Sequence, residues 1–276
     1  MFGKSTKEAE RSQELKQYIS ERNAECKTQA VPIPMIPDRL VLSEVMRANS
    51  ARFRNRGILP IGMEFDTVDY AMLNMYTDGT LTLAGDTESR DRFMKNLLLM
   101  LAQTIIFHNV EAVIIDDKQK RLAECAEYGY VKHYTADPAE GMLYISDFYD
   151  ELHRRQQDSE NGVDRSCLML VVQNVELFRK ICADKNESKA LADAMKNAAE
   201  AGVFVVLTAV ENQAVGFNSP EVYKTIKEMR KAVLFAPINE NKLFEVSFRA
   251  KPDPSFDKTM GYRFDGSSVS KIKIYE

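Results

Sequence analysis

The sequence has few residues of the kinds that build metal sites and disulfide frameworks. Its 276 residues include four cysteines, at positions 26, 125, 167 and 182, and three histidines, at positions 108, 133 and 153. None of the cysteines has C-x-x-C spacing, and the histidines are equally scattered. This pattern excludes a recognisable zinc motif. We predict structural or solvent-facing roles for all seven residues, in a reducing compartment.

A long apolar segment and a surplus of positive charge are also missing. The longest apolar stretch, residues 97–107, is interrupted by Gln103 and Thr104, whereas a membrane-spanning helix needs about 20 apolar residues. The first residues are strongly charged, so we expect no signal peptide. Acidic residues number 41 against 37 basic ones, which offers no general basic field for a nucleic-acid backbone. We therefore expect neither a membrane span in this chain nor a nucleic-acid partner.

The first fifty residues differ in pattern from the rest. Residues 5–27 are rich in helix formers, and Ser5 and Glu8 have the spacing of a capping box. Residues 31–40 contain three prolines, which force an extended path that serves as a strap or as a plain spacer. We predict an N-terminal helix and proline-rich linker over residues 1–50 and one domain over residues 51–276.

Beyond residue 58, short apolar runs alternate with longer helical stretches. We predict strands over residues 80–84, 110–115, 131–134, 167–172, 203–209 and 232–235, helices over 91–107, 144–157 and 188–201, and a closing hairpin over 261–275 that turns at Asp265 and Gly266. The run at 167–172 is apolar throughout, and the run at 203–209 contains Thr208 as its one polar residue, as in strands buried on both faces. The alternation predicts an α/β fold whose mostly parallel sheet has helices on both faces.

The first strand–helix unit has the length of a phosphate-binding loop but not its chemistry. A P-loop reads G-x-x-x-x-G-K-[ST] between a strand and a helix. Gly85 matches the first glycine; the residues that follow are Asp86, Thr87, Glu88, Ser89, Arg90, Asp91 and Arg92. Arg90, Asp91 and Arg92 therefore stand where the second glycine, the lysine and the Ser/Thr belong. We predict a degenerate nucleotide site at residues 85–92.

Each replacement weakens phosphate binding for a physical reason. Arg90 crowds the backbone where a glycine would let phosphates approach. Asp91 reverses the charge of the lysine, and two unit charges ~4 Å apart interact by roughly 4 kcal/mol at an effective dielectric of 20. The acidic residues of the loop, such as Asp86 and Glu88, can instead stabilise the helix start themselves. We expect no ATP/Mg²⁺ binding, or only weak binding helped by Arg90 and Arg92.

The residues after the strand at 167–172 also lack the acids of an active ATPase. The strand ends in Gln173 and Asn174, where an active P-loop ATPase carries acids that hold Mg²⁺ and activate water. Amides have no charge for either task, so we assign no catalytic residue. The alternative metal-binding strand is 110–115, which ends in Asp116 and Asp117. We interpret these two acids as a strand terminus or a helix cap.

Together these motifs resemble ATPase modules of the FtsK/SpoIIIE family. The segments that carry the resemblance are ILPIGMEF before the first of these strands, TLTLAGDTESRDR at the loop, VIIDD on the next strand, and the closing GYRFDG. The resemblance implies a RecA-like P-loop fold. The proline strap VPIPMIPDRL followed by LPIG is similar to the last ATPase module of EssC-type motors, which drive type VII secretion in Firmicutes.

The resemblance also implies a setting for the chain. EssC-type motors carry several ATPase modules in tandem after membrane helices, so the chain would be the cytoplasmic end of a larger membrane protein. Neighbouring modules, secreted WXG-motif proteins and a homo-hexamer of the full-length protein are the implied partners. Two alternatives remain. One is a working ATPase, either noncanonical or completed by a neighbouring subunit, and the other is a DNA translocase, which the acidic composition disfavours.

Overall fold

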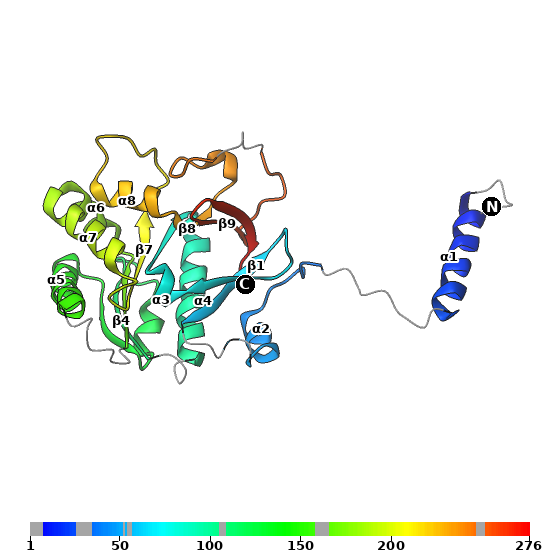
Figure 1. The fold of residues 1–276 in the computed structure, drawn as a ribbon, viewed down its shortest axis with the longest axis horizontal. Helices are drawn as coiled ribbons and strands as arrows, with labels where there is room; N and C mark the ends of the chain where they lie inside the picture. The colour runs from blue at the N-terminus through cyan, green and yellow to red at the C-terminus, as the bar shows by residue number, and fades with distance from the viewer. Residues whose placement is uncertain are drawn as a thin grey trace. The chain divides into compact units, whose positions relative to one another are not determined.

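The computed structural model describes residues 8–25, 35–51, 53, 57–104, 109–157, 166–246 and 252–276. The chain divides into two compact units, residues 1–35 and 36–276 (Figure 1). The first unit holds helix α1 (Glu8–Glu25), whose apolar residues Leu15, Tyr18 and Ile19 are exposed. This helix matches the predicted one, whereas Ser5 and residues 31–34 of the proline strap lie outside the described residues.

The second unit is built on one ten-stranded sheet with the strand order β2-β1-β10-β9-β8-β3-β7-β6-β4-β5. The strands are β1 (Ile58–Glu64), β2 (Tyr70–Asn74), β3 (Thr80–Gly85), β4 (Val110–Ile115), β5 (Val131–Thr135), β6 (Cys167–Val172), β7 (Val203–Val210), β8 (Lys231–Phe235), β9 (Met260–Asp265) and β10 (Ser268–Lys273). Strands β8, β3, β7, β6, β4 and β5 are parallel. The other four are antiparallel, and the predicted hairpin at the end of the chain is β9–β10.

Helices cover both faces of this sheet (Figure 1). Helices α2 (Leu42–Ala48) and α4 (Thr87–Thr104) pack on one face. On the other lie α5 (Pro138–Gln157), α6 (Val175–Ala183), α7 (Lys185–Asn197) and α8 (Glu221–Met229). A short helix, α3 (Met75–Asp78), and two 3-10 turns, η3 (Ala123–Glu127) and η5 (Ile238–Glu240), complete the described elements.

The central strands are buried because both of their faces are apolar. In β6, Met169 and Val171 join the core under α4, whereas Leu168 and Leu170 join the core under α5–α8. Alternate side chains of a strand point to opposite faces, so an unbroken apolar run fits a strand that is covered on both sides. The predicted α/β fold with a mostly parallel sheet is confirmed.

Several details differ from the sequence prediction, among them the start of α5, which lies at Pro138 rather than at residue 144. Helices α6 and α8 were not predicted, although each is amphipathic and nine residues long. Residues 42–48, placed with the linker in the sequence, form α2, which buries Leu42 and Val45 in the core of the second unit. Helix α4 begins at Thr87 rather than at residue 91. The last difference changes the candidate site.

Candidate functional site

Strand β3 runs almost directly into helix α4. The strand ends at Gly85 and the helix begins at Thr87. The loop expected between residues 85 and 90 is therefore absent, and residues 87–90 form the first turn of α4. This expectation was wrong because the P-loop length was assumed to carry a P-loop conformation.

The early helix start has a local cause in Asp86. Its carboxylate Oδ2 accepts hydrogen bonds from the backbone N–H and the hydroxyl of Ser89, both at 2.9 Å. Aspartate is among the best N-cap residues, and such a bond satisfies one of the free N–H groups of a first turn. The sequence D-x-x-S thus begins a helix where a P-loop would still be extended.

Backbone N–H groups at this helix start already have partners inside the protein. Asp86 donates its N–H to the carbonyl oxygen of Phe235 in β8 at 2.8 Å, and Arg90 donates its own to the carbonyl of Asp86 at 3.1 Å. A helix N-terminus attracts anions through its N–H groups and its dipole, and here the Asp86 carboxylate holds that position. Burial raises the pKa of Asp86, but the Ser89 hydrogen bonds and the nearby charges of Lys258 and Arg90 outweigh it, so the pKa is lowered.

The segment before β9 lies against the same helix start. The Ser89 hydroxyl donates to the carbonyl oxygen of Lys258 at 3.1 Å, and the Lys258 ammonium contacts the Glu88 carboxylate. Glu88 also accepts a hydrogen bond from Arg92 at 3.2 Å. Sequence reasoning missed Lys258, which lies far along the chain from α4 and belongs to no motif.

Asp91, at the lysine position, is held by two side chains from other elements. Arg121 donates to its Oδ2, and the amide Nε2 of Gln173 donates to its Oδ1 at 3.1 Å. Arg121 also pairs with Asp117, at 3.4 Å between Nε and Oδ2. The two degenerate positions predicted from the sequence, Asp91 and Gln173, therefore touch each other. Burial raises the pKa of Asp91, and the Arg121 guanidinium opposes that shift.

Arg90 and Gln173 both reach strand β7. An Nη of Arg90 donates to the carbonyl oxygen of Thr208, and the other donates to the Thr87 hydroxyl at 3.0 Å. The Thr208 hydroxyl donates to Oε1 of Gln173 at 3.2 Å. Side chains of the first turns of α4 are thus tied to the ends of β6 and β7 by hydrogen bonds within the protein.

Asn174, the other candidate at the end of β6, caps helix α6. Its side-chain oxygen accepts from the N–H of Leu177 at 2.9 Å, and its amide donates to the carbonyl oxygens of Asp116 and Ala136 at 2.9 and 3.3 Å. Both functional groups of this side chain are therefore engaged. An aspartate here would lose the two donated bonds.

Asp116, the competing metal acid, is fully buried and serves the loop that follows β4. Its Oδ2 accepts from the N–H of Leu122 at 2.7 Å and from the hydroxyl of Tyr134 at 2.9 Å, and its Oδ1 accepts from the N–H of Asp117 at 2.7 Å. Burial raises the pKa of Asp116 against these hydrogen bonds. The side chain orders a loop and does not cap a helix.

Asp116→Asn should lower the free energy of unfolding by about 1–3 kcal/mol, because the amide turns an N–H₂ group toward a buried donor. Urea denaturation followed by circular dichroism measures the change. Asp150→Asn, at an exposed aspartate of α5, is the matched control and should be nearly neutral. A variant at position 116 as stable as the unmodified chain would contradict the structural role of this carboxylate.

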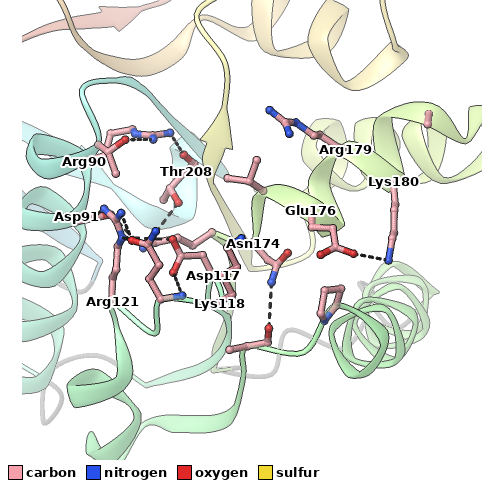
Figure 2. Close-up of a pocket in the computed structure, with 17 residues that line it drawn as sticks. Arg90, Asp91, Asp117, Lys118, Arg121, Asn174, Glu176, Arg179, Lys180 and Thr208 are labelled. Atoms are coloured by element: carbon pink, nitrogen blue, oxygen red, sulfur yellow. Dashed lines mark hydrogen bonds and ion pairs between the residues drawn. The ribbon is translucent and has the colours of Figure 1, made fainter.

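A cavity of about 720 Å³ opens beside these residues, at the carboxyl ends of β4, β6 and β7 (Figure 2). Ligands of open α/β sheets bind at this edge. Five basic and three acidic side chains are among its lining residues: Arg90, Lys118, Arg121, Arg179 and Lys180, with Asp91, Asp117 and Glu176. Arg179 and Lys180 extend from α6 across the cavity from Arg90 and Arg121 (Figure 2). Sequence reasoning missed Arg179 and Lys180, as it missed helix α6.

The fold is that of the P-loop ATPases. Its sheet is mostly parallel, and the β3–α4 unit lies beside the polar residues that follow β4 and β6. Solved structures of that class share this fold. The conjugation coupling protein TcpA, solved with ATPγS, is 12% identical, with a TM-score of 0.63 over 95% of this chain.

Two relatives with similar sequences are type VII secretion proteins. The ESX secretion system protein EccC of Geobacillus thermodenitrificans is 23% identical over 97% of this chain, and the type VII secretion system protein EssC of Staphylococcus aureus is 19% identical over 88%. The chain spans only 18% and 16% of the lengths of these two proteins. No protein-family profile matches the chain.

Solved ATPase modules of EssC and EccC proteins have the same fold. ATPases 2 and 3 of EssC from G. thermodenitrificans superpose with a TM-score of 0.69 at 21% identity, over 99% of this chain and 51% of that one. ATPases 2 and 3 of Thermomonospora curvata EccC, solved in complex with a signal sequence peptide, give 0.67 at 20% identity, over 99% and 49%. The resemblance to EssC-like, FtsK-type ATPase modules that the motifs indicated is confirmed.

Proposed function

We propose that this chain is a non-hydrolysing, ATPase-like module of a type VII protein secretion motor. The proposal rests on Asp86 and Asp91, whose carboxylates lie at the positions where a P-loop would bind phosphates. Asp86 is bound by Ser89, and Asp91 is bound by Arg121 and Gln173. A triphosphate would meet two negative charges where a P-loop offers a lysine and open backbone donors.

The similarity to EssC and EccC supports a role in secretion rather than in DNA transport. We propose that the module lies in the cytoplasm as part of a membrane-attached motor, which assembles through neighbouring ATPase modules and possible homo-hexamers. The EccC structure with a signal sequence peptide supports secreted proteins, of the WXG-motif class, as the other partners. Among the described residues, no helix is long and apolar enough to span a bilayer.

An ATP hydrolysis assay tests the proposal. The purified chain should release phosphate from Mg·ATP no faster than a heat-denatured sample, at both low and high protein concentration. The high-concentration arm is included because subunits of ring ATPases share sites. ATP turnover that is abolished both by EDTA and by Asp117→Asn would contradict the proposal. Asp117 is chosen for this variant because it lines the cavity, whereas its neighbour Asp116 does not.

A second candidate is a working or weakly nucleotide-binding ATPase that a neighbouring subunit completes. The five basic side chains around the cavity favour it, because such a lining attracts anions. This candidate predicts labelled-ATP binding that appears only when the chain is part of an oligomer. Absence of binding in both states would leave the non-hydrolysing module as the function.

A further inference from the structure

A groove beside helix α5, away from the candidate site, has an apolar floor and an acidic rim. Its volume is about 170 Å³, and α5 lies at one margin of the second unit (Figure 1). An apolar cavity of about 150 Å³ can hold one benzene ring, so this groove has room for one large side chain. Its lining residues are Glu111 and Val113 of β4, Lys132 and His133 of β5, Leu168 of β6, and Tyr144, Asp147, Phe148 and Glu151 of α5.

The floor and one wall of the groove are apolar. Val113, Phe148 and Leu168 form the floor and are buried. The wall is a stacked pair of rings, His133 and Tyr144, whose centres lie 4.8 Å apart. His133 is exposed and Tyr144 is half-buried. A side chain in the groove would therefore contact mainly these two rings.

Helix α5 places negative charge and a further apolar side chain along the groove. Between residues 138 and 151 its sequence has four acidic residues and no lysine or arginine. Leu143 is 66% exposed and lies four residues before Asp147, so the two side chains are neighbours on one face of the helix. An apolar contact and a carboxylate are thus presented together.

The charge of the rim comes chiefly from two of its acids. Asp147 is exposed, and its carboxylate has no ion-pair partner among the described residues. The Glu111 carboxylate lies 3.9 Å from the Lys132 ammonium, and both side chains are about half exposed. Glu151, in contrast, is held by two arginines that follow it on α5, each at 2.7 Å. Asp147 and Glu111 therefore carry the negative charge that a partner would meet.

Strand β5, on the other side of the groove, is poorly suited to pair with an added strand, although it is the end strand of the sheet. Its register with β4 shifts, because Ala112 pairs with Val131 whereas Val113 pairs with His133, which leaves Lys132 as an extra residue. Bulges and lysines on edge strands prevent strand addition. The carboxylates of the rim also repel phosphate groups of nucleic acids and of anionic lipids. A partner segment in helical form fits this surface better.

We propose that the α5 groove binds a basic amphipathic helix of another protein. The four lining residues on α5 recur at intervals of three and four, so they form one line along the helix. One apolar side chain of the partner enters the groove beside Tyr144, and another covers Leu143. Lysines or arginines next to them meet Asp147 and Glu111. The inference goes beyond the proposed function and does not depend on ATP chemistry.

Fluorescence anisotropy of a labelled peptide tests the proposal. The probe is a peptide of about 18 residues, long enough to form a helix, built from alanine with leucines on one face and lysines on both sides of them. It should bind the full chain with a dissociation constant below about 100 μM, a weak affinity because the interface is small.

Variants of the chain test the location. Asp147→Lys should raise the dissociation constant at least about tenfold, and Leu143→Ala should raise it about threefold or more. Both positions are exposed, so the variants should fold, and circular dichroism checks this. Glu44→Lys makes the same change of charge at an exposed position of α2, on the other face of the sheet, and should leave the constant unchanged.

Altered peptides test the chemistry of the partner. Glutamate in place of every lysine should abolish binding, because like charges would then meet at the rim. A central proline, which breaks the helix, should weaken binding at least about tenfold. The proposal is overturned if the lysine peptide fails to bind, if Asp147→Lys binds it as well as the unmodified chain does, or if the proline peptide binds equally well.

Discussion

Replacing Gly85 by alanine should lower the free energy of unfolding by about 3 kcal/mol or more. Gly85 has a φ of +99°, which L side chains rarely adopt, and a Cβ added there would lie 2.4 Å from the carbonyl oxygen of Phe235. That oxygen belongs to the backbone of β8, which pairs with β3 at this position. The neighbour cannot move aside without breaking the sheet.

Thermal and urea unfolding of Gly85→Ala measures the loss. Gly129→Ala is the matched control, because a Cβ at Gly129 meets no atom within 4 Å and its φ is not positive; it should change stability by less than about 0.5 kcal/mol. If Gly85→Ala were as stable as the unmodified chain, the close approach of β3 and β8 would be wrong. On this account the match of Gly85 to a P-loop glycine follows from the geometry of the sheet and says nothing about phosphate binding.

Arg121→Ala should lower the free energy of unfolding by about 2 kcal/mol. Its guanidinium pairs with Asp91 and Asp117, whose side chains are only 17% and 20% exposed. Removing one partner of a largely buried pair leaves the other charge desolvated and unpaired. The partial exposure of Arg121, at 29%, keeps the expected loss below that of a fully buried pair.

A double-mutant cycle with Asp91→Asn isolates this contact. The double variant should be less destabilised than the sum of the two single variants, because the unpaired charge is no longer present. Lys118→Ala removes an exposed cation from the same loop and should be nearly neutral. Additive effects at positions 91 and 121 would show that the ion pair does not stabilise the helix start.

The fold could be predicted because its signals are local and strong. The apolar run of β6, and that of β7 with Thr208 as its one polar residue, identify strands buried on both faces, and the Asp265–Gly266 turn identifies the final hairpin. The position of Gln173 directly after β6 followed from spacing, whereas Asp91 lies inside α4 and not at its start. That the two side chains would touch, at 3.1 Å, required the packing of α4 against the end of β6.

The remaining features depend on interactions that spacing does not reveal. The D-x-x-S pattern at Asp86 and Ser89 was a readable N-cap signal, but the match to P-loop length took precedence, so the helix was started too late. Arg121 and Lys258 reach the site from a loop and from the segment before β9, and neither has a motif around it. Helices α6 and α8 are short, and short amphipathic segments are hard to separate from loops.

Calorimetric titration of the chain with Mg·ATP tests the central claim most directly. If the carboxylates of Asp86 and Asp91 fill the phosphate side of the site, no saturable heat should appear up to about 1 mM ligand, near the weak limit of specific binding. A titration that saturates at micromolar ATP, with one nucleotide bound per chain, would contradict the account.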